Sequence, residues 1–68
     1  MALSARNQIR GTVTGVTSGE ATANVEIDAN GVRLVASITT EAARELGLEE
    51  GTEVTAIIKA SDVLIATD

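Results

Sequence analysis

Residues 21–38 read ATANVEIDANGVRLVASI, and this stretch decides the fold. Over residues 21–28 apolar and polar side chains alternate, the period of two that predicts a strand with one buried face. Asn30 and Gly31 follow, and both residues accept the positive φ that a tight hairpin turn requires. A partner strand over 32–38 completes an antiparallel hairpin. The fold is therefore expected to be mainly β.

Shorter β-branched runs on either side of the hairpin predict three more strands, over residues 8–16, 52–58 and 62–66. Gly11 and Gly15 interrupt the first of these runs, and glycine inside a strand is typical of a bulge or a sharp bend. Five strands this short favour a small barrel, because closing the sheet limits its exposed edges.

One short helix is predicted over residues 39–47, between the third and fourth strands. A threonine at its start can cap it, and Glu41 lies at the positive end of the helix dipole. Gly47 supplies the left-handed residue that commonly ends a helix. Leu46 and Leu48 are expected to fasten this helix to the core.

The length and composition of the chain predict one domain, residues 1–68, that associates with copies of itself. Hydrophobic residues make up 44% of the chain and charged residues 22%. A domain this small usually needs a disulfide, a structural metal or self-association for stability. The absence of Cys and His removes disulfides and most structural metal sites. A monomer held together by tight strands stays as the alternative.

The residue types that are missing favour binding over catalysis. The chain has no Cys, His, Phe, Tyr or Trp, so thiolates, imidazoles and base-stacking rings are unavailable. A net charge of −5 opposes association with nucleic acids and anionic membranes. The first residues lack the pattern of a signal peptide and no apolar run is long enough to cross a membrane, so a cytoplasmic protein is expected.

Four short motifs, taken in order, resemble the molbindins, the small molybdenum-pterin-binding (Mop) proteins, and the TOBE/Mop oxyanion-binding modules of molybdate-responsive regulators and transporter ATPases. They are Ser4-Ala5-Arg6-Asn7-Gln8, Ile38-Thr39, Leu46-Gly47-Leu48 with Gly51, and Lys59-Ala60-Ser61-Asp62.

The resemblance implies an OB-fold-like subunit in a homohexamer built as a trimer of dimers. It also implies binding of molybdate or tungstate between subunits, for molybdenum storage and homeostasis in the cytoplasm. No cofactor and no enzymatic activity are expected. A regulatory or structural module that senses an oxyanion and reports to a separate partner is the alternative function.

Carried over position by position, the resemblance assigns the ligand contacts to Ser4, Ala5, Arg6, Thr39, Lys59, Ala60 and Ser61. A tetrahedral dianion suits such a set, because hydroxyls, an ammonium and peptide amides all donate hydrogen bonds to its oxygens. The molybdenum itself is enclosed by those oxygens, so no direct metal coordination is expected. This chain carries Ala42 where relatives of the regulator type can carry a hydroxyl.

Each assignment has a plainer alternative. Residues 59–61 also fit an ordinary solvated turn, and Thr39 also fits a simple helix cap. The side chain of Arg6 can pair with a carboxylate instead of the ligand, and Asn7 and Gln8 are expected to make strand or interface hydrogen bonds. The acidic residues at 49, 50 and 53 are interpreted as a solvated face rather than a divalent-cation site.

Overall fold

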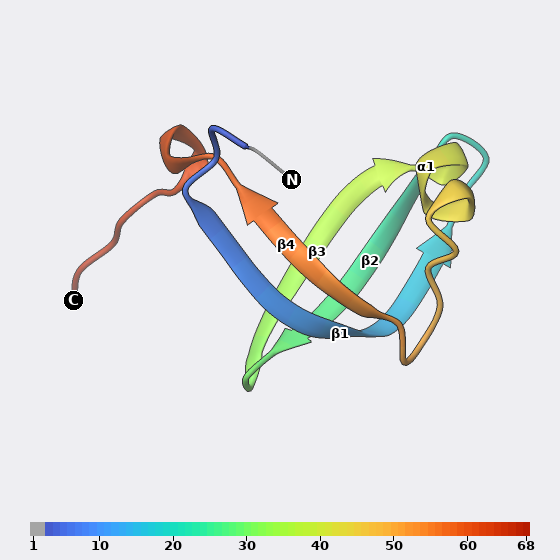
Figure 1. The fold of residues 1–68 in the computed structure, drawn as a ribbon, viewed down its shortest axis with the longest axis horizontal. Coiled ribbons are helices and arrows are strands. Elements are labelled where there is room, and N and C mark those ends of the chain that lie inside the picture. The colour runs from blue at the N-terminus through green and yellow to red at the C-terminus, as the bar shows by residue number, and fades with distance from the viewer. Residues whose placement is uncertain (1–2) are drawn as a thin grey trace.

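The computed structural model describes residues 3–68 and shows a curled antiparallel sheet with one short helix (Figure 1). The sheet has the strand order β3-β2-β1-β4. Its elements are β1 (Asn7–Ser18), β2 (Thr22–Ala29), β3 (Val32–Thr39), α1 (Thr40–Glu45), β4 (Glu53–Ile58) and the 3-10 turn η1 (Ala60–Asp62). The mainly β, OB-like fold and the place of the helix between β3 and β4 are as predicted.

The hairpin between β2 and β3 confirms the sequence prediction. Asn30 and Gly31 have φ values of 53° and 87°, so both turn residues adopt the left-handed conformation. The amide of Gly31 donates to Oδ1 of Asp28 at 2.9 Å, which fastens the turn to the end of β2. The hairpin register then runs without a shift from Ala29 opposite Val32 to Thr22 opposite Thr39.

A bulge bends β1, where the glycines of the first predicted strand indicated one. The register against β2 shifts between Val13 and Gly15, so Thr14 is an extra residue in the strand. Because of that extra residue, Val13 and Val16 lie three positions apart and still both pack on the core. The bend is what lets one long strand pair with β2 along one half and with β4 along the other.

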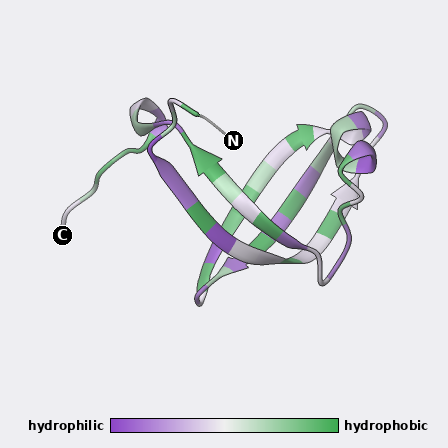
Figure 2. Ribbon diagram, in the orientation of Figure 1, coloured by the Kyte–Doolittle hydropathy of each residue, from purple (hydrophilic) through white to green (hydrophobic). Residues whose placement is uncertain are grey.

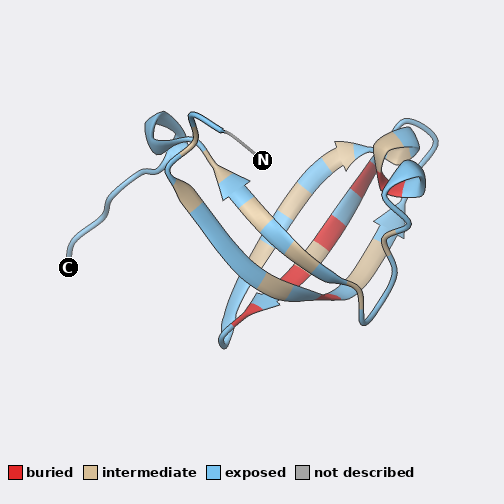
Figure 3. Cartoon of the chain, in the orientation of Figure 1, coloured by how far each residue is buried: buried red, intermediate tan, exposed pale blue. Residues whose placement is uncertain are grey.

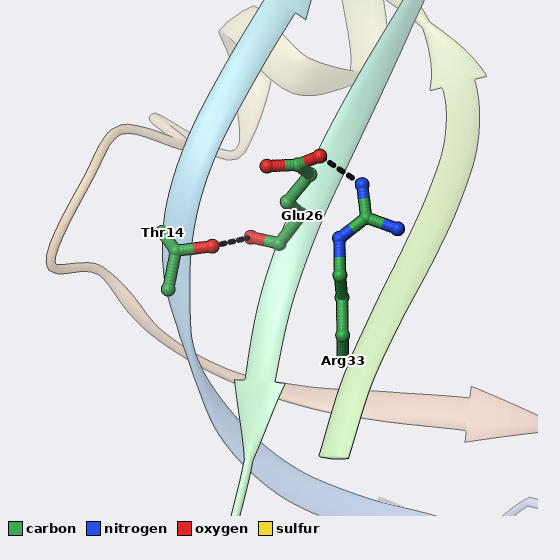
Figure 4. A network of polar contacts seen from close by, with 3 residues as sticks. All are labelled: Thr14, Glu26 and Arg33. Carbon is green, nitrogen blue, oxygen red and sulfur yellow. Dashed lines mark hydrogen bonds and ion pairs between the residues drawn. The ribbon is translucent and has the colours of Figure 1, made fainter. Parts of the chain in front are cut away.

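Polar contacts on the outer face hold the bulge in register. The hydroxyl of Thr14 donates to the carbonyl oxygen of Glu26 at 3.3 Å. The carboxylate of Glu26 forms an ion pair with Arg33 on β3, so the three side chains join three neighbouring strands (Figure 4). Both members of the ion pair are substantially exposed, and such pairs contribute up to about 1 kcal/mol.

The core is small and centred on β2, as Figure 3 shows. The hydropathy colours of β2 alternate along the strand, in agreement with the period-two pattern (Figure 2). Val13 and Val25 are each 1% exposed and form its centre. The buried residues are Val13, Ala23, Val25, Ile27, Ala29 and Ala43.

Ala43 of helix α1 is buried and Leu48, just beyond the helix, packs on the core, whereas Leu46 does not. Leu48 is partly buried against the core cluster, as predicted. Leu46 is 68% exposed, so the prediction that it fastens the helix was wrong. The reason is the length of α1: the helix has six residues, Ala43 takes its buried position, and Leu46 is the C-cap residue. Gly47, with a φ of 65°, ends the helix as expected.

The predicted fifth strand over residues 62–66 does not form, so the sheet has four strands rather than five among residues 3–68. Asp62 belongs to η1 instead, and residues 63–68 follow as a tail without regular structure. Turn η1 leads this tail away from the sheet (Figure 1). The tail therefore has no strand beside it to accept its backbone hydrogen bonds, which is what a strand requires.

Without that strand, an apolar groove stays open between β3 and β4. The groove has a volume of about 520 Å³ and is lined by both strands, with Val25 and Ile27 of β2 also contributing. Strands β3 and β4 are the two ends of the sheet order, so each has one edge without a partner strand. We refer to this feature as the β3–β4 groove.

Candidate functional site

Pairing of β1 with β4 brings two of the sequence motifs to one end of the molecule. Asn7, the first residue of β1, lies opposite Ile58, the last residue of β4. The side-chain amide of Asn7 also donates to the carbonyl oxygen of Ile58 at 3.1 Å. Residues 4–6 directly precede this pair and residues 59–61 directly follow it. Two segments more than fifty positions apart in the chain therefore start from the same point of the sheet.

Residues 59–61 form the beginning of a tight turn. The amide of Asp62 donates to the carbonyl oxygen of Lys59 at 2.9 Å, and that of Val63 donates to Ala60 at 3.2 Å. The amides of Ala60 and Ser61 precede the first of these hydrogen bonds, so the turn itself does not use them. Lys59, Ala60 and Ser61 are all exposed. The turn thus offers an ammonium, a hydroxyl and peptide amides to solvent.

The N-terminal motif is equally accessible. Ser4 and Arg6 are exposed and Ala5 is half-buried. The side-chain amide of Gln8 lies 3.5 Å from the carbonyl oxygen of Ala5, and, as expected, Asn7 makes a hydrogen bond between strands. Ion pairs among residues 3–68 join Arg10 to Glu53 and Arg33 to Glu26, so Arg6 pairs with none of the described carboxylates.

Thr39 lies at the other end of the sheet. It ends β3 opposite Thr22, close to the turn that joins β1 to β2, whereas residues 59–61 adjoin the start of β1 (Figure 1). Its hydroxyl oxygen accepts a hydrogen bond from the amide of Ala42 at 3.0 Å, so Thr39 is the N-cap of α1. A hydroxyl that accepts in this way still has its own proton to donate. Within one chain, six of the seven predicted ligand-contacting residues, those at 4–6 and 59–61, therefore lie at one end of the sheet, and Thr39 lies at the other.

Replacing Thr39 by Ala is expected to lower the free energy of unfolding by about 1 kcal/mol, because the amide of Ala42 loses its capping partner. Replacing Thr39 by Ser retains the oxygen and serves as the control. Urea unfolding of both variants at one protein concentration measures the difference. Equal destabilisation by the two substitutions would show that the cap hydrogen bond contributes nothing.

Two of the acidic residues, Asp28 and Glu53, lie together near the β2–β3 hairpin. A polar hollow of about 270 Å³ at the β2–β3 hairpin contains the carboxylates of Asp28 and Glu53, which repel an anion. Arg10 lies 3.6 Å from Glu53 there, and both side chains are about three-quarters exposed. Within residues 3–68 no three His, Cys, Asp or Glu side chains gather as metal ligands.

The TOBE domain family matches residues 3–65 of the chain. The chain belongs to this family. Among its relatives, molybdenum-pterin-binding protein 1 of Clostridium pasteurianum is 44% identical over 66 residues, which is 96% of this TOBE domain and 97% of the relative. The chain is thus a TOBE domain of the Mop type, and the resemblance noted in the sequence is confirmed.

Solved structures agree with the fold of this TOBE domain. A molybdate-binding protein from Sporomusa ovata superposes with a TM-score of 0.94 at 34% identity, covering 98% of this chain and all of that protein. The cytoplasmic molybdate-binding protein ModG, solved with molybdate bound, gives a TM-score of 0.85 at 44% identity, covering 88% of this chain and 43% of ModG.

Two features of this TOBE domain were missed in the sequence. Thr40 fixes the start of α1, because its hydroxyl donates to the carbonyl oxygen of Gly19 and its amide donates to Ala21, both at 2.9 Å. Asp62 places a carboxylate inside η1, next to the donors of residues 59–61. The Ser61-Asp62 pair was the available signal, since both residue types favour turns over strands. In the described part of the chain no helix is long and apolar enough to cross a membrane.

Proposed function

We propose that this TOBE domain binds molybdate and tungstate, as intact tetrahedral oxyanions, where copies of the chain meet. The observation that carries the proposal is the pairing of Asn7 with Ile58, which sets the donors of residues 4–6 beside those of residues 59–61. Further support comes from the relatives and solved structures named above, which are described as molybdenum-pterin-binding and molybdate-binding proteins.

Binding rests on hydrogen bonds and one cation, not on bonds to the metal. Ser4 and Ser61 contribute hydroxyls, Lys59 contributes an ammonium, and the amides near Ala5 and Ala60 contribute N–H groups. Three to five charge-assisted hydrogen bonds at about 1.5–3 kcal/mol each give a gross gain on the order of 5–15 kcal/mol, a range that includes the ~8 kcal/mol of a micromolar complex, before the cost of desolvating the dianion. The chemistry is binding and release, so the protein acts without catalysis and needs no cofactor.

Thr39 makes the site a shared one. It lies at the end of the sheet opposite residues 59–61, so it reaches the same anion only from a second copy of the chain. The exposed apolar side chains of the tail and of the groove favour such association. We propose the homohexamer, arranged as a trimer of dimers, as the assembly.

A buffering role follows from this chemistry. A protein that binds an oxyanion reversibly and transforms nothing serves storage and homeostasis of molybdenum, here in the cytoplasm. The net charge of −5 makes nucleic acids and anionic membranes poor partners. The same negative charge disfavours an oxyanion, so positive charge near the site must offset it. Lys59 and Arg6 are the cations available for that at the motif-bearing end.

Calorimetric titration with molybdate, tungstate, sulfate and phosphate tests the proposal. We expect micromolar or tighter binding of molybdate and tungstate with little difference between them, since the two anions have nearly the same size and charge. Sulfate shares their charge and shape but is smaller, so it is expected to bind at least tenfold more weakly. Absence of heat with molybdate at tens of micromolar protein would contradict the proposed function.

A further inference from the structure

The turn between β2 and β3 is an exposed Asn-Gly pair. Asn30 and Gly31 are both open to solvent, and the turn lies at the end of the sheet away from α1 (Figure 1). A Cβ atom built on Gly31 would meet no other atom within 4 Å, so the space around this residue is open. Because glycine has no side chain, nothing on Gly31 itself screens its backbone amide from the carboxamide of Asn30.

This pair of groups can react with each other. The amide nitrogen of Gly31 attacks the side-chain carbonyl carbon of Asn30, a C–N bond forms, and a five-membered cyclic imide closes. The attacking nitrogen gives its proton to water, and the side-chain nitrogen takes up a proton and leaves as ammonia. Water then adds to one of the two imide carbonyls and opens the ring, which leaves either aspartate or an isoaspartyl link. Water is the co-reactant, and no group is oxidised or reduced.

The other two asparagines of the chain are placed less favourably for this reaction. Asn7 lies opposite Ile58 in the sheet and donates its side-chain amide to the carbonyl oxygen of that residue. Asn24 pairs with both neighbouring strands and precedes Val25, whose branched side chain crowds the amide that would attack. Asn30 is the asparagine that glycine follows, so the reaction is expected there.

The carboxylate of Asp28 opposes ring closure. Its Oδ1 atom accepts a hydrogen bond from the amide of Gly31 at 2.9 Å. The amide has one N–H, so it must leave Asp28 before its nitrogen can turn toward the Asn30 side chain. The attack also places negative charge on that nitrogen, and a carboxylate this close repels the charge. The turn therefore has to open at Asp28 before the ring can form.

We propose that Asn30 is a site of deamidation and that Asp28 slows the reaction by holding the amide of Gly31. The product changes the hairpin in two ways. A carboxylate at position 30 joins those of Asp28 and Glu53 at the same polar hollow, and like charges repel. An isoaspartyl link adds a carbon to the backbone of a tight turn, which disturbs the register of β2 with β3. Neither part depends on molybdate binding.

Prolonged incubation of the folded protein at mildly alkaline pH, followed by peptide mass spectrometry, tests the site. Replacement of the side-chain amide by a carboxyl raises the mass by about 1 Da. We expect this gain on the peptide that contains Asn30, with fragmentation showing both aspartate and isoaspartate there. The peptides that contain Asn7 and Asn24 are the internal controls and are expected to keep their masses.

Asp28→Ala tests the role of the carboxylate. We expect deamidation at Asn30 to become about fivefold faster, the effect of losing one hydrogen bond. Glu53→Gln is the matched control, because it removes a carboxylate from the same hollow and leaves the bond to Gly31 in place. Its rate is expected to equal that of the unmodified protein. In concentrated urea all three proteins are expected to react at one rate, since the turn is then lost.

The contrary results are equally defined. No mass gain at Asn30, or equal gains at Asn7 and Asn24, would overturn the assignment of the site. A rate in Asp28→Ala that is unchanged, slower, or matched by Glu53→Gln would overturn the role of Asp28. Asp28→Asn retains the acceptor oxygen without the charge, so it replaces Asp28→Ala if that variant fails to fold. Its rate is then expected to exceed that of Glu53→Gln, and equal rates would contradict the proposal.

Discussion

Gly11→Val is expected to lower the free energy of unfolding by about 3 kcal/mol, because β1 and β2 leave no room for a side chain at this position. A Cβ atom on Gly11 would lie 2.6 Å from Cγ2 of Ile27 and 2.8 Å from the backbone oxygen of Asp28. The second contact is with backbone and cannot be relieved by a rotamer change. The melting temperature at fixed protein concentration is expected to fall by at least about 12 °C.

Gly15→Val is the matched control for this substitution. A Cβ on Gly15 would meet only the carboxylate of Glu26, at 3.7 Å, and valine is a good strand former. The control is therefore expected to melt near the temperature of the unmodified protein. If Gly11→Val melts with the control, the close approach of β1 to β2 is not what requires glycine at position 11.

Lys59→Gln is expected to weaken molybdate binding about tenfold or more, which is the loss of one hydrogen bond from a charged donor. Glutamine retains much of the length and a hydrogen-bonding end, so the substitution isolates the charge. Because Lys59 is exposed and makes no ion pair within residues 3–68, the assembly and the melting temperature should change little. Calorimetry measures the affinity and light scattering measures the assembly.

Arg33→Gln removes the same charge from a different place and serves as the control. Arg33 pairs with Glu26 on the outer face of the sheet, near the β2–β3 hairpin (Figure 4). If binding depends only on the net charge of the protein, both variants should weaken it equally. Molybdate affinity that is unchanged in Lys59→Gln would remove this side chain from the site.

The parts of the fold that could be predicted are those that local chemistry determines. The alternation over β2 places one face in the core, and the hairpin needs Asn30 and Gly31 for its left-handed turn. The bulge near Gly15 and the end of α1 at Gly47 have equally local causes. The four strands that form and the helix were therefore found to within a few residues at each end.

The fifth strand was predicted wrongly because an apolar composition does not by itself supply the neighbouring strand edge that a strand needs. Residues 63–65 have the side chains of a strand and, in one chain, no adjacent edge. Leu46 is a similar case, since its exposure follows from the short length of α1 and not from its residue type. A sequence pattern indicates which secondary structure a segment can form. Whether residues 63–65 pair with a strand edge depends also on the direction in which η1 leads them.

The residue types of the candidate site could be predicted from the sequence, but their arrangement in space could not. Nothing in the composition shows that residues 4–6 and 59–61 start from one point, because that depends on the register of Asn7 with Ile58. The separation of Thr39 depends likewise on the pairing of β2 with β3. The β1–β4 register and the β2–β3 pairing are both long-range features. Together they are the reason to propose that the site is shared between copies of the chain.

Crystals of the protein grown with molybdate, measured for anomalous scattering at the molybdenum absorption edge, test the central claim most directly. The account predicts peaks between protomers, each within hydrogen-bond distance of residues 59–61 of one copy and of Thr39 from another. Peaks that contact a single protomer, or no peaks at saturating molybdate, would contradict it.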